Sequence, residues 1–290
     1  MYILIVFSVL IASINSVLLK KTRLNEKTEL FKFNLCTALI WCIVLFITNK
    51  GQLYLNASIW MWGMVYGLAQ SFFIFFKAAA MNTGAVSVTT LIGNSSLFVS
   101  IFASLIIWKE KVTVMDLLGL LLLGVAIFLC TYKKSETSYT ASWKYYAVLF
   151  LVFAASVGII FKGFGKSGNL EHCGDMMLVA ALTMVVFYTV ACGLMGGWNF
   201  KQTFGAQSRE KQKEFIGFAV GSGILSCLYN RLNIFLSGSM DAVIFFPAFN
   251  GGVVLVSALL GVLFCKERLS KKQVAGIGIG ILAIVVIGIL

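Results

Sequence analysis

Long apolar runs alternate with short polar connections along the whole chain. Each run is about 18–24 residues long, which is enough for a helix to cross roughly 30 Å of hydrocarbon. Ten such runs occupy residues 2–19, 33–49, 59–80, 85–108, 112–132, 144–165, 176–198, 215–236, 242–264 and 273–290. Because the connections are mostly short, consecutive helices should lie side by side as antiparallel neighbours. The pattern predicts an all-α membrane protein with ten transmembrane helices.

One part of this pattern occurs twice. Residues 84–127 align without a gap on residues 241–284, and the shift of 157 positions carries Glu110 onto Glu267. In both copies an apolar helix leads into a short Lys-Glu-basic turn and then into a second apolar helix with an early glycine. A duplicated hydrophobic unit is typical of transporters that are built from two structural repeats.

The duplication extends upstream into the third and eighth helices. There, Gly63, Gly67 and Lys77 match Gly217, Gly221 and Arg231 at a shift of 154 positions. Five helices are an odd number, so two consecutive copies must enter the membrane in opposite directions. We therefore expect two inverted-topology five-helix repeats, residues 1–132 and 144–290, joined by a connecting loop at 133–143.

Each predicted repeat ends in a charged turn followed by a glycine-bearing last helix. The two turns read Lys109-Glu110-Lys111-Val112-Thr113 and Lys266-Glu267-Arg268-Leu269-Ser270. Ten helices in two repeats with such turns resemble the EamA-type transporters of the drug/metabolite transporter superfamily. The resemblance implies transport of a small molecule, which in this family is a metabolite, amino acid, sugar, nucleotide sugar or drug. The small multidrug members carry a proton-coupling glutamate in their first helix. No apolar run of this chain has an interior Asp or Glu, so proton-coupled export of cationic drugs is not expected.

Composition indicates that the protein lies in a membrane, and the distribution of charge predicts how it is oriented there. Hydrophobic residues make up 60% of the chain and charged residues 12%, which excludes a soluble globular domain. The net charge is +12, with sixteen Lys and Arg residues in or beside the odd-numbered connections and four in the even-numbered ones. By the positive-inside rule, the odd connections should be cytoplasmic and both termini outside the cell membrane. The charge therefore orients the protein in the lipid bilayer, and no nucleic-acid partner is expected.

Polar residues inside the apolar runs are the leading candidates for a substrate site. Asn94 and Asn250 are the tenth and ninth residues of their helices, so both should lie near the bilayer midplane. A buried amide without a partner is costly in hydrocarbon, so each must meet either another helix or a wet cavity. We favour the cavity, because inverted-repeat transporters bind cargo at the midplane. The weaker candidates are Asn15, Ser16, Gln70, Ser71, Ser156, Tyr229, Asn230 and Asn233.

Four cations lie within or at the ends of apolar runs. Lys77 and Arg231 are equivalent in the two repeats and are candidates to attract an anionic group near opposite mouths of a central cavity. The alternative for both is snorkelling, in which an apolar stem carries the charge to the membrane interface. Lys20 and Lys162, at the ends of the first and sixth helices, are interpreted as interfacial.

Proline and glycine suggest where helices bend and where they touch. Pro247 is the sole proline and lies three residues before Asn250, so it should kink or locally open the ninth helix. It is a candidate hinge, although a static packing kink is the simpler alternative. Gly-x-x-x-Gly spacings at Gly63, Gly217 and Gly276 allow close helix contact, and we expect internal packing rather than dimerisation.

The remaining chemistry argues against other classes of protein. Seven cysteines are an odd number and mostly lie in apolar runs, and His172 is the one histidine, so neither a disulfide framework nor a metal site is expected. No cofactor and no catalytic residue is predicted. We expect a secondary transporter for a neutral, zwitterionic or anionic metabolite, either a monomer or a homodimer. A membrane channel is the first alternative and a membrane-embedded enzyme the second.

Overall fold

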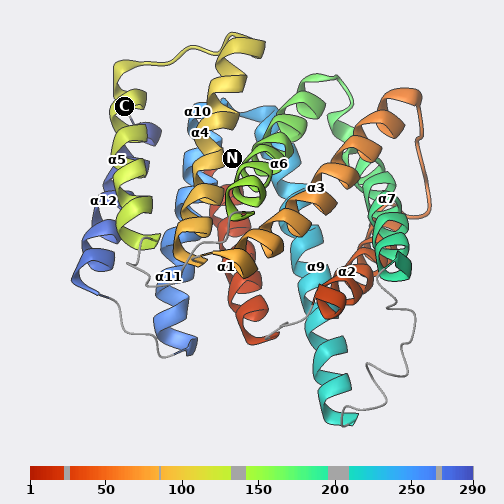
Figure 1. The fold of residues 1–290 in the computed structure, drawn as a ribbon. Coiled ribbons are helices and arrows are strands. Elements are labelled where there is room, and N and C mark those ends of the chain that lie inside the picture. Colours follow the sequence, from red (N-terminus) through yellow and green to blue (C-terminus); the bar gives the residue numbers. More distant parts are fainter. Residues whose placement is uncertain (23–26, 85, 132–141, 195–208, 266–269, 290) are drawn as a thin grey trace.

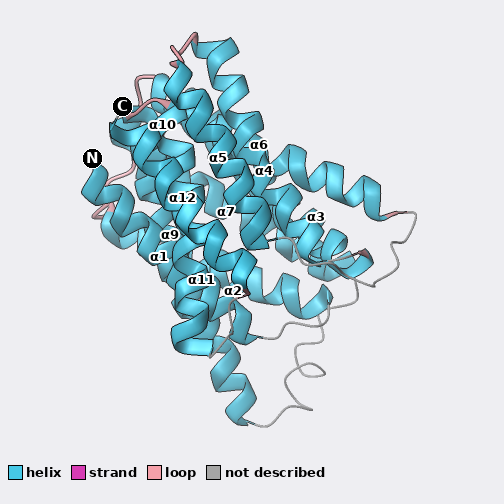
Figure 2. Ribbon diagram, turned by 90° about the vertical axis from the view of Figure 1, so that its left-hand side faces the viewer, coloured by secondary structure: helices cyan, strands magenta, loops and turns pink. Residues whose placement is uncertain are grey.

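The protein is a bundle of long helices. The computed structural model describes residues 1–22, 27–84, 86–131, 142–194, 209–265 and 270–289 (Figure 1). The first half contains α1 (Tyr2–Thr22), α2 (Lys27–Thr48), α3 (Ala57–Thr83), α4 (Val86–Trp108) and α5 (Val114–Thr131). The second half contains α6 (Trp143–Lys166), the 3-10 helix η1 (Leu170–His172), α7 (Cys173–Leu194), α9 (Arg209–Ser239), α10 (Ala242–Phe246), the π-helix η2 (Pro247–Gly251), α11 (Gly252–Cys265) and α12 (Lys271–Ile289). No strand occurs among these residues (Figure 2).

The observed helices correspond to the ten predicted apolar runs. Within the described residues, nine helical segments are long and apolar enough to cross a membrane, and α10, η2 and α11 together make the ninth. The helix α12 covers the tenth predicted run and packs along α5. Multi-pass membrane insertion is therefore supported. The predicted starts of the second and eighth helices were too late, because α2 and α9 both extend by about one and a half turns into the polar residues before the apolar run. The predicted connecting loop at 133–143 falls mostly outside the described residues.

Two peripheral helix pairs flank the centre of the bundle. The pair α5 and α12 lies on the left of Figure 1, and the pair α2 and α7 on the right. One buried apolar cluster joins α2, α3, α6 and α7 around Trp41, Tyr66 and Phe164. The other joins α1, α4, α5, α10 and α12 around Leu123 and Phe245. Helices from both clusters contribute to the walls of the candidate site.

The final residue of each charged turn is the N-cap of the helix that follows. The backbone N–H of Thr113 donates to Asp116 at 2.8 Å, and the backbone N–H of Asp116 donates to the Thr113 hydroxyl at 3.2 Å. At the second copy, Ser270 and Gln273 make the same reciprocal pair at 3.0 and 3.3 Å. These capping boxes satisfy helix-end donors that lack intrahelical partners. The Ser/Thr of the repeated turn is thus explained by helix initiation.

Close packing accounts for two of the three predicted glycine motifs. At Gly276, a Cβ atom would lie 2.8 Å from Cys130 Sγ, so this part of α12 rests on α5. A Cβ atom on Gly63 would lie 2.6 Å from Val179 Cβ, and one on Gly67 would lie 2.6 Å from the Ala180 carbonyl oxygen. The α3 backbone therefore rests directly on α7, which confirms internal packing at this motif. Gly217 differs, because a Cβ there would meet nothing within 4 Å among the described atoms.

We predict opposite effects for alanine at two of these glycines. Gly67→Ala should lower the melting temperature in detergent, because overpacking a close helix contact costs about 1–3 kcal/mol. The matched control Gly217→Ala should leave it unchanged or raise it, since alanine is favoured over glycine in helices by roughly 0.5–1 kcal/mol. Equal melting temperatures for the two variants would contradict the assigned α3–α7 contact.

Candidate functional site

A cavity of about 240 Å³ lies between helices from both halves of the chain. Its walls come from α3, α4, α6, α9 and the α10–η2 segment. The residues that line it are Gln70, Phe73, Lys77, Thr90, Gly93, Asn94, Ser96, Leu97, Ser100, Phe150, Ala154, Val157, Gly158, Phe161, Tyr229, Asn230, Asn233, Phe245, Phe246, Phe249 and Asn250. Polar groups and aromatic rings therefore meet in one cavity within the membrane-spanning region.

The structure brings together most of the residues singled out from the sequence. Seven of them line the cavity, namely Gln70, Lys77, Asn94, Tyr229, Asn230, Asn233 and Asn250. Asn15 and Arg231 are not among the lining residues. Asn15 is buried in α1, and its Oδ1 atom has no hydrogen-bond partner among the described residues. The Arg231 guanidinium donates to the Thr48 hydroxyl at 2.9 Å, so it contacts the end of α2.

The helix that carries Asn250 opens beside the cavity. Pro247 begins the π-helical turn η2, at the place where the sequence predicts a kink or local opening of the ninth membrane segment. Proline has no N–H to donate, and a π-helical turn widens the backbone spiral by one residue. The Asn250 side chain donates to the Phe246 carbonyl oxygen at 3.1 Å. One donor of this amide is thus used within the turn, and its oxygen makes no hydrogen bond among the described residues.

The amides around the cavity fall into two groups. Asn230 donates to the Ser226 carbonyl at 2.8 Å, and Asn233 accepts from the Ser8 hydroxyl at 2.7 Å, so these two side chains are held in place. Gln70 and Asn94 make no side-chain hydrogen bond to any described residue, although both lie inside membrane-spanning helices. Unpaired amides are costly in a dry apolar environment. Their presence on the wall indicates that the cavity admits water or a polar ligand.

Lys77 supplies the positive charge of the cavity. Its Nζ atom lies 5.9 Å from the centre of the Phe73 ring, one turn earlier on α3, within the range of a cation–π contact. No acidic side chain lines the cavity, and none pairs with Lys77 in the part of the chain that the structure describes. A cation inside a membrane-spanning helix usually marks a ligand or ion pathway.

A buried ion pair between Lys162 and Glu110 joins α6 to the turn after α4. The interfacial position predicted for Lys162 was wrong. Lys162 was expected at the interface, yet its side chain is 0% exposed and pairs with Glu110, which is 6% exposed. Lys162 also donates to the Met240 carbonyl oxygen, and Glu110 accepts the backbone N–H of Ala242 at 2.8 Å. The carboxylate thereby neutralises a buried cation and binds the N-terminus of α10, where helix N–H groups favour negative charge.

The repeated turn contained the signal for this ion pair. Lys109 adopts a left-handed backbone with φ of 52° directly after α4 ends. This single reversal, which commonly terminates helices, turns the chain so that Glu110 points back into the bundle. The conserved order Lys-Glu-basic in both copies indicated that the glutamate had a role, but the sequence could not identify its partner. The equivalent Glu267 and its neighbours lie outside the described residues.

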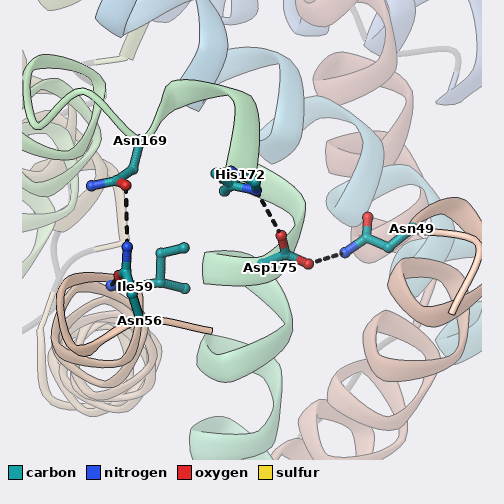
Figure 3. Close-up of polar contacts among 6 residues, drawn as sticks. All are labelled: Asn49, Asn56, Ile59, Asn169, His172 and Asp175. Carbon is teal, nitrogen blue, oxygen red and sulfur yellow. Dashed lines mark hydrogen bonds and ion pairs between the residues drawn. The ribbon is translucent and has the colours of Figure 1, made fainter. Parts of the chain in front are cut away.

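A second set of polar contacts ties neighbouring connections together (Figure 3). The Asn49 amide donates to Asp175 at 2.9 Å, and His172 Nδ1 lies 3.2 Å from the same carboxylate. The Asn56 amide lies 3.4 Å from Asn169 Oδ1, while its own oxygen caps α3 by accepting the Ile59 N–H. These contacts join the α2–α3 and α6–α7 connections. No group of three potential metal ligands occurs among the described residues.

Comparisons with known proteins agree with this architecture. Residues 1–132 match the EamA-like transporter family, which confirms the family predicted from the repeated turn. The matched segment covers the first five helices, so this part of the chain is similar to EamA-like transporters. A solved structure described only as a crystal structure of a protein matches with a TM-score of 0.75 and 10% identity, over 99% of this chain and 96% of the other. At that identity the likeness shows the fold alone. No curated protein matches the sequence.

Removing the carboxylate of the buried pair should destabilise the protein strongly. Glu110→Ala leaves Lys162 buried without its counter-charge, and breaking one side of such a pair costs about 3–5 kcal/mol. The melting temperature in detergent should fall by several degrees, and the double variant Glu110→Ala/Lys162→Met should recover much of the loss. Glu171→Ala, which removes an exposed glutamate of η1, is the matched control. Equal melting temperatures for Glu110→Ala and Glu171→Ala would show that the pair does not stabilise the fold.

Proposed function

We propose that the protein is a secondary transporter that moves a small polar metabolite across the cell membrane by alternating access. The observation that carries the proposal is the cavity itself, which lies inside membrane-spanning helices of both halves and presents unpaired amides. It adjoins the π-helical turn that begins at Pro247, and π-helical turns within α-helices are frequent at functional sites. Asn94, Asn250 and Gln70 are the proposed cargo contacts.

Two inverted repeats, residues 1–132 and 144–290, are the proposed framework. The reciprocal caps at Thr113 and Ser270 support it, because the same local geometry recurs at the predicted shift of 157 positions. The central asparagines also match in an exchanged order: Gly93-Asn94 aligns with Asn250-Gly251. Each repeat would therefore contribute one amide and one small residue to opposite walls of the same cavity.

An asymmetry between equivalent helices supports alternating access. The helix α6 packs closely on α9, where a Cβ atom on Gly165 would lie 2.2 Å from Gly238 Cα. The equivalent helices of the first repeat are α1 and α3, and their described residues do not pack together in this way. We call the end of the bundle where Gly165 meets Gly238 the packed end, and the Glu110–Lys162 pair lies there. We propose that this end is the extracellular one in the orientation expected from the positive charges, and that the two ends exchange these arrangements during transport.

Transport kinetics separate this proposal from a channel. A carrier must rebind cargo at each turnover, so flux into proteoliposomes should saturate and should show counterflow. A ligand for this assay can be found by screening metabolites for those that raise the melting temperature of the purified protein. Flux that increases linearly with concentration, without counterflow, would contradict a carrier and favour a channel.

Substituting the cavity amides should weaken binding of that ligand without unfolding the protein. For Asn94→Ala we expect a loss of about 1–2 kcal/mol, or roughly a tenfold rise in Kd, because one ligand hydrogen bond disappears. Asn34→Ala is the control. Like Asn94, Asn34 lies within a membrane-spanning helix, but it is on α2, does not line the cavity and donates to the Leu30 carbonyl oxygen. Equal Kd values for Asn94→Ala and Asn34→Ala would contradict the proposed site.

A wedge in the packed end should change which side of the membrane reaches the cavity. Gly165→Leu cannot approach Gly238 without a clash, so it should hold this end open. We expect faster labelling of Asn94→Cys by a membrane-impermeant thiol reagent added outside intact cells, in a background without other reactive cysteines. Gly168→Leu would strain a left-handed turn, so exposed Ser167→Leu is the better control. Unchanged outside labelling in Gly165→Leu would contradict closure at this point.

A further inference from the structure

The charge on the cavity wall has one sign and one source. Among the lining residues, Lys77 is the one with a full positive charge, and no Asp or Glu is present. The other ionisable lining group is the phenol of Tyr229, which is neutral at physiological pH. Arg231, the sequence equivalent of Lys77 in the second half, contacts Thr48 instead. A ligand therefore meets a single uncompensated cation.

Two amides, Gln70 and Asn94, share the cavity with Lys77. Gln70 and Lys77 are seven residues apart, which places them two turns apart on one side of the helix, and both line the cavity. Asn94 faces the same space from α4 and has no hydrogen bond to any described side chain or backbone group. The cavity wall thus offers one ammonium and two amides, and an oxyanion accepts hydrogen bonds from both kinds of donor.

The rest of the cavity is suited to a compact apolar body. Six phenylalanine rings line it, namely Phe73, Phe150, Phe161, Phe245, Phe246 and Phe249. The volume of about 240 Å³ is below the roughly 300–1,000 Å³ of drug-sized ligand pockets. A ligand of this cavity is therefore small, with most of its surface against aromatic carbon.

We propose that the cargo is a small carboxylate with one net negative charge and an apolar or aromatic body, bound through its carboxylate to Lys77. The charge balance favours a monoanion, because a dianionic phosphate would leave one charge uncompensated inside the membrane. A free ammonium on the ligand would find no carboxylate among the lining residues. This inference rests on the proposed transport function and specifies the cargo and the residue that selects it.

The test compares probes that share a ring and differ in charge. Benzoate, benzamide, benzylamine, phenylalanine and phenylphosphonate would each be titrated against the purified full-length protein while its melting temperature is followed. Benzoate should stabilise wild type best, and Lys77→Gln should raise its apparent Kd at least tenfold. Lys77→Arg should retain most of the affinity, since it keeps the charge. The control Lys166→Gln, which removes an exposed lysine at the end of α6, should leave the Kd unchanged.

Several outcomes would overturn the inference. It fails if phenylphosphonate, benzamide or phenylalanine binds wild type as tightly as benzoate, if Lys77→Gln binds benzoate normally, or if no carboxylate binds. If Asn94→Ala weakens the binding of a ligand, whatever its charge, that result would still support a binding site in the cavity. The transport proposal has its own readout in saturable counterflow, so a transporter of neutral cargo is distinguishable from a protein that transports nothing. Preserved melting temperatures of the ligand-free Lys77 variants serve to separate lost binding from lost folding.

Discussion

The structure depends on one constraint, which is that charge and backbone polarity inside hydrocarbon must be matched within the protein. The Glu110 carboxylate meets this constraint for two elements at once, because it pairs with Lys162 of α6 and accepts a hydrogen bond from the first turn of α10. The carbonyl of Met240 completes the surroundings of the ammonium. Three segments that are distant in sequence are therefore held at one point, where α6 also meets α9. A half-broken ion pair would leave a buried charge unpaired, which is costly. Such a pair is suited to a site that is either fully closed or fully open.

The cavity shows the opposite treatment of polar groups. The amides of Asn230 and Asn233 are paired, whereas Gln70, Asn94 and Lys77 have no hydrogen-bond or ionic partner in the described part of the chain. The unpaired groups lie on α3 and α4, and the paired ones on α9. A ligand would thus supply hydrogen bonds mainly to one wall while the other remains preorganised. The interruption at Pro247 gives the remaining wall a segment whose backbone geometry can change.

Much of this organisation was predictable because the bilayer imposes strong rules on sequence. Apolar length predicted the helices, and the duplicated turn predicted the family, since only helix-length periodicity and local spacing were needed. The position of Asn94 within its helix was enough to predict the cavity wall. Partnerships between distant residues were not predictable. Lys162 was interpreted as interfacial and Arg231 as a cation near a cavity mouth, yet Lys162 is fully buried against Glu110 and Arg231 donates to Thr48. Their difference depends on which helices meet, and one sequence does not specify this.

Distance measurement across the packed end tests the central claim most directly, namely that α6 and α9 separate and rejoin during the working cycle. Spin labels at Ser167→Cys and Ser239→Cys, two exposed positions at the ends of these helices, would report their separation in liposomes. We expect two distance populations, with the shorter one depleted by Glu110→Ala, which removes the closing ion pair. A single short distance that is unaffected by Glu110→Ala and by any transported ligand would contradict it.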